Sequence, residues 1–189
     1  MILPVVAYGD SVLRKKAIEI DKNYTDLDTL IKNMWDTMYK ANGVGLAAPQ
    51  IGLPIRLFVI DTVQVEEDED GHIEEKGIKQ AFINATITQK IGKPYVYNEG
   101  CLSIPGVRED VSREPDISIT YYDENFKKHK AEFTGTNARV ILHEYDHIEG
   151  VLFTDYLKPL KKRLLKKQLT NISKGIVDVK YKMRFPKKK

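Results

Sequence analysis

The sequence has a single cysteine, Cys101, among its 189 residues, so an intrachain disulfide is excluded. Secreted domains commonly contain several cysteines, whereas a lone thiol fits a reducing compartment. The N-terminus lacks a basic segment followed by a long apolar one, and no apolar run approaches the roughly 20 residues that span a bilayer. We therefore expect a cytoplasmic protein without a membrane partner.

An excess of charge of one sign is also absent, because 30 Lys and Arg are balanced by 27 Asp and Glu, for a net charge of +3. Taken over the whole chain, this balance gives no indication of DNA binding. The basic residues gather near the C-terminus, where residues 158–189 contain thirteen Lys or Arg and one acid, Asp178. The acidic residues gather at 66–75, where like charges repel one another and predict a solvated loop.

Hydrophobic periodicity predicts helices and several strands. Apolar residues recur at helical spacing over residues 25–41, and a second helix is expected from about 137 to 148, where Gly150 ends it. One helix, many strands and another helix indicate the α+β class, with antiparallel strands packed around the second helix. Runs of β-branched and aromatic residues that predict strands lie at 55–60, 81–89, 94–97, 117–122 and 128–133.

The segment His143-Glu144-Tyr145-Asp146-His147 carries a recognisable chemistry. Two histidines four residues apart stand on one face of a helix, so both imidazoles can reach one Zn²⁺-like ion. Glu144 lies beside the first of them and can take a proton from a water activated by the metal. The alternative is coincidence, in which two ordinary histidines flank an unrelated glutamate.

A catalytic metal of this kind needs a third protein ligand. After His147 no histidine follows and Glu149 points to a different helix face, which leaves Asp155 and Asp178 as downstream candidates. Cys101 is a better candidate, because a thiolate is a strong ligand and a flanking glycine allows close approach. An isolated cysteine is more often a small buried residue, and only the incomplete two-histidine site favours the ligand role.

Hydrolysis of an amide builds negative charge on the carbonyl oxygen, which needs preorganised hydrogen-bond donors. The side-chain amide of Gln50, in the small-residue loop at 43–52, is one candidate donor. The backbone N–H of Leu102, next to Cys101, is another. Taken alone, a glutamine in a glycine-rich loop is usually a surface residue.

Three segments of the chain form a recognisable set. They are Gly43-Val44-Gly45-Leu46-Ala47-Ala48-Pro49-Gln50, Glu99-Gly100-Cys101-Leu102-Ser103 and His143-Glu144-Tyr145-Asp146-His147. Together they resemble the three motifs of the peptide deformylase family, in the same order and at similar spacing. The likeness covers residues 3–165, and three motifs in order are far more specific than one.

The resemblance implies a metal-dependent hydrolase that removes the N-formyl group from the formyl-methionine of new polypeptides and releases formate. The metal ligands would be Cys101, His143 and His147, with one position open to water. One divalent ion per chain is implied, with Fe²⁺ as the native ion and Zn²⁺, Ni²⁺ or Co²⁺ able to replace it. Equilibrium affinity by itself favours Zn²⁺ over Fe²⁺.

The resemblance also implies roles for residues around the metal. Glu144 would take the proton of the attacking water and deliver it to the leaving amine. Gln50 and the Leu102 amide would hold the developing oxyanion. Three residues are implied to bind the substrate. Val44 would line the methionine pocket, Gly45 would pair with the peptide backbone, and Arg108 would make a side-chain contact.

We expect a single deformylase domain over residues 1–170 and a basic tail over 171–189, with a strand rather than a helix at 176–185. The basic face at 158–169 is either a solvated helix surface or a site for a polyanion. Ribosomal RNA would suit an enzyme that acts on nascent chains. The alternative activity is a metallopeptidase with a downstream aspartate as third ligand. A binding protein that kept the fold is a third hypothesis, which no residue favours.

Overall fold

The computed structural model describes residues 1–64 and 76–187, so the acidic tract at 66–75 lies outside the described residues. Helices α1 (Leu27–Lys40) and α2 (Gly135–Ile148) confirm the two helices predicted from periodicity, and α3 (Pro159–Ser173) follows them. The strands in chain order are β1 (Val5–Val6), β2 (Gly45–Ala47), β3 (Leu57–Asp61), β4 (Lys79–Ile91), β5 (Tyr95–Cys101), β6 (Ile104–Arg113), β7 (Asp116–Tyr122), β8 (Lys128–Phe133) and β9 (Met183–Arg184).

Five of these strands form the main sheet in the order β2-β3-β4-β7-β8, in which every neighbouring pair is antiparallel. Strands β5 and β6 form a separate antiparallel hairpin, and the short β1 and β9 pair in parallel. The α+β class with antiparallel strands is thus confirmed. The long strand β6 was not predicted, because Pro105, Gly106 and several charged residues interrupt its apolar alternation.

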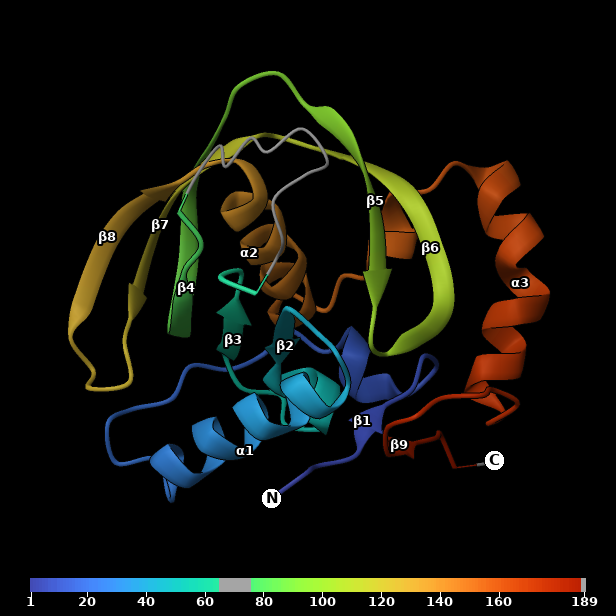
Figure 1. Ribbon diagram of the computed structural model, residues 1–189, viewed down its shortest axis with the longest axis horizontal. Helices are drawn as coiled ribbons and strands as arrows, with labels where there is room; N and C mark the ends of the chain where they lie inside the picture. Colours follow the sequence, from blue (N-terminus) through green and yellow to red (C-terminus); the bar gives the residue numbers. More distant parts are fainter. Residues whose placement is uncertain (65–75, 188–189) are drawn as a thin grey trace.

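Both faces of the main sheet are covered by helices, which explains why all five residues of β3 are buried. Side chains alternate between the two faces along a strand. On one face, Val59 of β3 packs in a cluster with Met34 of α1. On the other face, Phe58 packs with Ile141 of α2. Helix α2 lies between the main sheet and the β5–β6 hairpin (Figure 1).

The start and end of α2 follow from local sequence. The helix is preceded by Thr134 in an extended conformation and is followed by Gly150, which has a positive φ of 76°. A Cβ atom at Gly150 would lie 2.8 Å from the carbonyl oxygen of Arg14. Only glycine fits this position without strain, so the helix ends where the sequence predicted.

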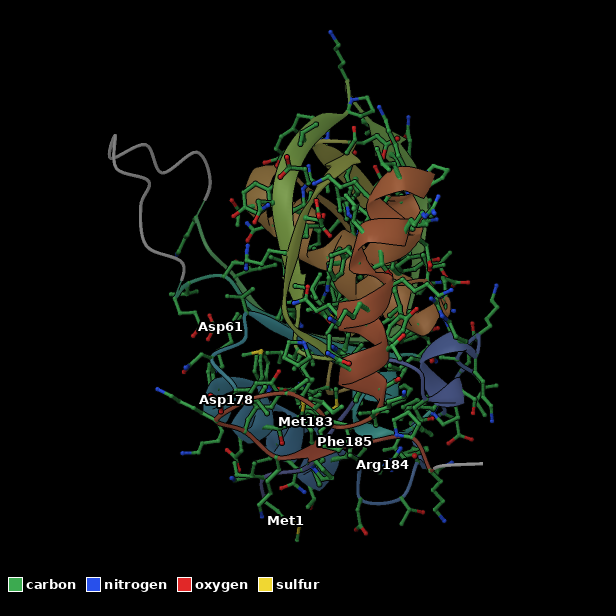
Figure 2. The ribbon with its side chains drawn as sticks, turned by 90° about the vertical axis from the view of Figure 1, so that its right-hand side faces the viewer. Met1, Asp61, Asp178, Met183, Arg184 and Phe185 are labelled. Carbon is green, nitrogen blue, oxygen red and sulfur yellow. The ribbon has the colours of Figure 1, made fainter. Side chains whose placement is uncertain are left out.

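The C-terminal segment is only partly as predicted. Leu169 and Ile172 of α3 are buried against the β6 hairpin strand. Of the stretch 176–185, only Met183–Arg184 forms a strand, because its partner β1 is itself two residues long. Figure 2 shows this segment running below α3, from Asp178 through Met183 to Phe185.

Within residues 1–64 and 76–187, no helix combines the length and the apolar composition that crossing a membrane requires.

Candidate metal centre

Three potential ligands that are distant in sequence meet at one point. The ligand atoms of Cys101, His143 and His147 all lie within 4.8 Å of one another, and Cys101 Sγ is 3.2 Å from His147 Nε2. Strand β5 places the cysteine at its C-terminal end, and α2 places the two histidines one turn apart on one face. One thiolate and two imidazoles in this arrangement can hold a tetrahedral divalent ion with one position left for water.

The protonation state of His147 fits this donor set. Burial, followed by the positive charges of His143 and Arg113, holds the pKa of His147 well below its usual value. This shift favours the neutral imidazole, which is the form that binds a metal.

Glu99 orients the first histidine of the helix. Its Oε2 lies 3.0 Å from Nδ1 of His143, and a histidine that donates from Nδ1 presents Nε2 as a ligand. Burial opposes ionisation of Glu99, but hydrogen bonds from His143 and Arg113, with the charge of Arg113, lower its pKa to about 2. Glu99 is therefore a carboxylate at neutral pH, a role that the sequence did not predict.

Two buried arginines tie the hairpin to the helix. Arg113 of β6 donates to Glu99 at 2.7 and 3.0 Å and to Asp146 of α2 at 2.7 Å. Arg139 of α2 donates to Glu99 at 3.1 Å and to the backbone carbonyl of Tyr95 at 2.9 Å. Buried charges are costly unless they are paired in this way. The network therefore holds the strand that carries the cysteine in register with the helix that carries the histidines.

Glu144 is buried, and its Oε2 has no hydrogen-bond partner among the described residues. Burial raises the pKa of Glu144 to about 7; the charge of His143 opposes the rise, and those of Glu99 and Asp146 add to it. Buried carboxylate oxygens are normally paired. One left unpaired beside three potential metal ligands fits a group that accepts a proton from water at the same site.

A cleft of about 650 Å³ opens onto the site and is lined by Cys101, His143 and Glu144. Three residues that the family resemblance implies to bind substrate also line it: Val44, Gly45 and Arg108. Arg108 is held by Asn98, to which its Nε and Nη2 donate at 2.9 and 2.6 Å.

Gly45 lies in strand β2, at the edge of the main sheet, where the small-residue pattern predicted only a loop. The glycine-rich sequence hid the strand, because small residues have low strand propensity. A Cβ atom at Gly45 would lie 2.4 Å from Oε1 of Glu144, so any larger residue would displace the Glu144 side chain. An edge strand next to a cleft can pair with an extended peptide.

The two candidate oxyanion donors also lie at the cluster. Gln50 accepts the N–H of Ala47 at 2.8 Å through Oε1, which turns its Nε2 toward Cys101 Sγ at 3.4 Å and Ser103 Oγ at 3.3 Å. Leu102 lies in the two-residue turn between β5 and β6 and lines the cleft.

The downstream aspartates considered as third ligands do not join the cluster. Asp155 binds Arg14 at 2.5 and 3.1 Å and accepts the N–H of Leu152 at 2.8 Å. Asp178 lines the cleft, but among the described residues the ligand group contains neither aspartate. The metallopeptidase alternative therefore lacks the ligand that it requires.

The chain is similar along most of its length to one known family of proteins. The family model described as polypeptide deformylase matches residues 2–163. The peptide deformylase of Christiangramia forsetii is 58% identical, and the match covers all of this chain and 98% of that protein. That of Flavobacterium psychrophilum is 54% identical over the full length of both chains.

Solved structures with this fold carry the same name. The crystal structure of a peptide deformylase from Legionella pneumophila is 35% identical, with a TM-score of 0.78 over 93% of this chain and 98% of that one. Arabidopsis thaliana peptide deformylase 1B in complex with an inhibitor is 33% identical, with a TM-score of 0.79 over 92% of each chain.

Proposed function

The chain belongs to the peptide deformylase family, a family of metalloenzymes that remove the N-formyl group from nascent formyl-methionyl peptides, and we propose that Cys101, His143 and His147 hold its metal ion. The observation that carries this proposal is their cluster of ligand atoms within 4.8 Å, beside the unpartnered carboxylate oxygen of Glu144. The thiol and the two imidazoles are a donor set suited to a divalent ion.

The roles of the surrounding residues follow from their positions. A divalent ion bound by the three ligands would act as a Lewis acid and activate a water molecule. Glu144 accepts a proton from that water and returns it to the methionine nitrogen as the C–N bond to the formyl carbon breaks. The side-chain amide of Gln50 and the backbone N–H of Leu102 donate to the carbonyl oxygen as it becomes negative. Formate and a free amino terminus are the products.

The peptide is proposed to lie along the free edge of β2. Pairing with the backbone of Gly45 would bring an extended chain past Glu144, and the exposed Val44 would contact the methionine side chain. Arg108 belongs to strand β6 of the β5–β6 hairpin and lines the cleft, where it can contact the rest of the peptide.

We propose Fe²⁺ as the native ion, with Zn²⁺, Ni²⁺ or Co²⁺ able to replace it, and one ion per chain. Protein purified and loaded with Fe²⁺ without oxygen is expected to release formate from formyl-Met-Ala, whereas the metal-free protein releases none. An Fe²⁺–thiolate site should lose activity in air faster than a Zn²⁺-loaded one, because the thiolate and the ion are both oxidisable. No formate from the anaerobic Fe²⁺-loaded protein would contradict the proposed function.

The site of action is proposed to be the cytoplasm, where nascent formyl-methionyl chains are made, and the basic face of α3 is proposed to contact the ribosome. Arg163, Lys166 and Lys167 are exposed on this helix. Phosphate-rich RNA attracts such a face, and the attraction weakens as salt rises. Truncation of the chain after Leu157 would remove this basic face, but it would also remove the buried Leu169 and Ile172 and so disturb the core.

Reversal of three charges on α3 tests ribosome contact while keeping the fold. The variant Arg163→Glu, Lys166→Glu, Lys167→Glu is expected to lose co-sedimentation with ribosomes at low salt and to keep its formate release from formyl-Met-Ala. The matched control reverses three exposed lysines near the β7–β8 turn, at 127, 128 and 130. Equal co-sedimentation of the two variants would exclude a specific role for α3.

A further inference from the structure

The C-terminal segment reaches the active-site cleft. Residues 178–181 line the cleft together with Cys101 and Glu144. They lie beyond residue 163, where the match to the family model ends. A part of the chain outside the three motifs thus forms one wall of the site.

This segment is anchored on the body of the molecule. The N–H of Val5 donates to the carbonyl of Lys182 at 2.8 Å, and the N–H of Ala7 donates to that of Arg184 at 2.9 Å. Met183 and Phe185 pack in a core cluster that also contains Val6 and Ala7 of the N-terminal segment. Figure 2 shows the labelled Met183, Arg184 and Phe185 close together below α3. Tyr181, two residues before Met183, is therefore held in place.

Tyr181 makes one hydrogen bond to the turn that carries the site. Its hydroxyl donates to the carbonyl oxygen of Leu102 at 2.7 Å. Burial, and then the nearby Cys101, raise the pKa of Tyr181, so the phenol keeps its proton and remains a donor. The next residue of the turn is held as well, because the N–H of Tyr8 donates to the carbonyl of Ser103 at 2.8 Å.

We propose that Tyr181 is a positioning residue for deformylation, which holds the Leu102 carbonyl and thereby aims the Leu102 N–H at the oxygen that becomes negative. The N–H and the carbonyl of Leu102 belong to two peptide planes that share its Cα atom. A hydrogen bond to the carbonyl therefore restrains how the N–H can rotate. Misplacement of a transition-state donor by about 1 Å can cost about 100-fold in rate, so a modest loosening has a measurable effect.

This inference rests on the proposed function of Leu102, and Tyr181→Phe tests it by removing only the hydroxyl. The expected result is a fall of about 3- to 10-fold in kcat for formyl-Met-Ala, in line with the loss of one neutral hydrogen bond. KM should stay unchanged, because the interaction with the oxyanion is made only in the transition state. The melting temperature should fall by no more than about 5 °C, as expected for one lost hydrogen bond, and the metal content should stay unchanged.

Amide hydrogen exchange provides a readout that does not depend on the reaction. In the metal-free Tyr181→Phe protein, a peptide covering residues 99–105 is expected to exchange faster than in the wild type, while the rest of the protein exchanges as before. The matched control is Tyr122→Phe, which removes a hydroxyl from β7, outside the cleft lining. It should change neither kcat nor the exchange of residues 99–105.

Several outcomes would overturn the proposal. They are an unchanged kcat, a rise in KM alone, a fall in kcat that only follows a lower melting temperature, and a fall in kcat without faster exchange of 99–105. If the wild-type protein released no formate, the proposed function would fail, and the exchange comparison would still show whether Tyr181 restrains the turn.

Discussion

Replacement of Glu144 by Gln is expected to lower kcat for formate release from formyl-Met-Ala by about 10²- to 10⁴-fold, the usual contribution of a general acid–base group. Glutamine has nearly the same shape as glutamate but cannot accept the proton of the attacking water. The three proposed metal ligands are untouched, so the variant should still bind one ion per chain. Kinetics and metal analysis on the same preparation measure both quantities.

The matched control is Glu124→Gln, at an exposed position in the turn between β7 and β8, which should leave kcat unchanged. A Glu144→Gln variant that kept its metal and more than about a tenth of the wild-type kcat would contradict the proton-transfer role. A variant that lost its metal would instead show that Glu144 helps to hold the ion.

Replacement of Cys101 by Ala is expected to remove the metal and, with it, the activity. Loss of a group that merely orients a ligand costs about 10- to 100-fold in metal affinity, and Cys101 is itself a proposed ligand. We therefore expect affinity to fall by more than about 100-fold. Metal content after dialysis against a weak chelator, followed by formate release, measures the two effects.

Two aspartate variants provide the comparison for Cys101. Asp155→Asn and Asp178→Asn should both retain metal, because neither side chain belongs to the ligand cluster. The pair between Arg14 and Asp155 is partly exposed, so its loss should change stability little. Metal retention by Cys101→Ala, with loss in either aspartate variant, would favour the metallopeptidase alternative over the proposed site.

The sequence by itself determined the helices and the candidate metal ligands. The i, i+4 spacing of His143 and His147 is enough to place them on one face, because helix geometry is local and repeats every 3.6 residues. The apolar stripe of α1 and the glycine that ends α2 are local signals of the same kind. The order of the three motifs also indicated the family, which the comparisons then showed.

The tertiary structure alone decided which groups meet across the chain. Nothing local to Glu99, Arg113 or Arg139 shows that they are buried, since charged residues in a sequence look alike whether they face solvent or one another. Their pairing depends on how the β5–β6 hairpin packs on α2, which sequence periodicity does not encode.

The same reason applies to the strands that were missed or misjudged in length and to the contact of Tyr181 with Leu102. Strand β6 is stabilised by its partner β5 in spite of its own composition, and β9 is only as long as β1 allows. Tyr181 is far in sequence from the turn that it holds, and only the pairing of the two chain ends brings it there. Local patterns thus determined which chemical groups the chain carries, and long-range packing decided which of them act together.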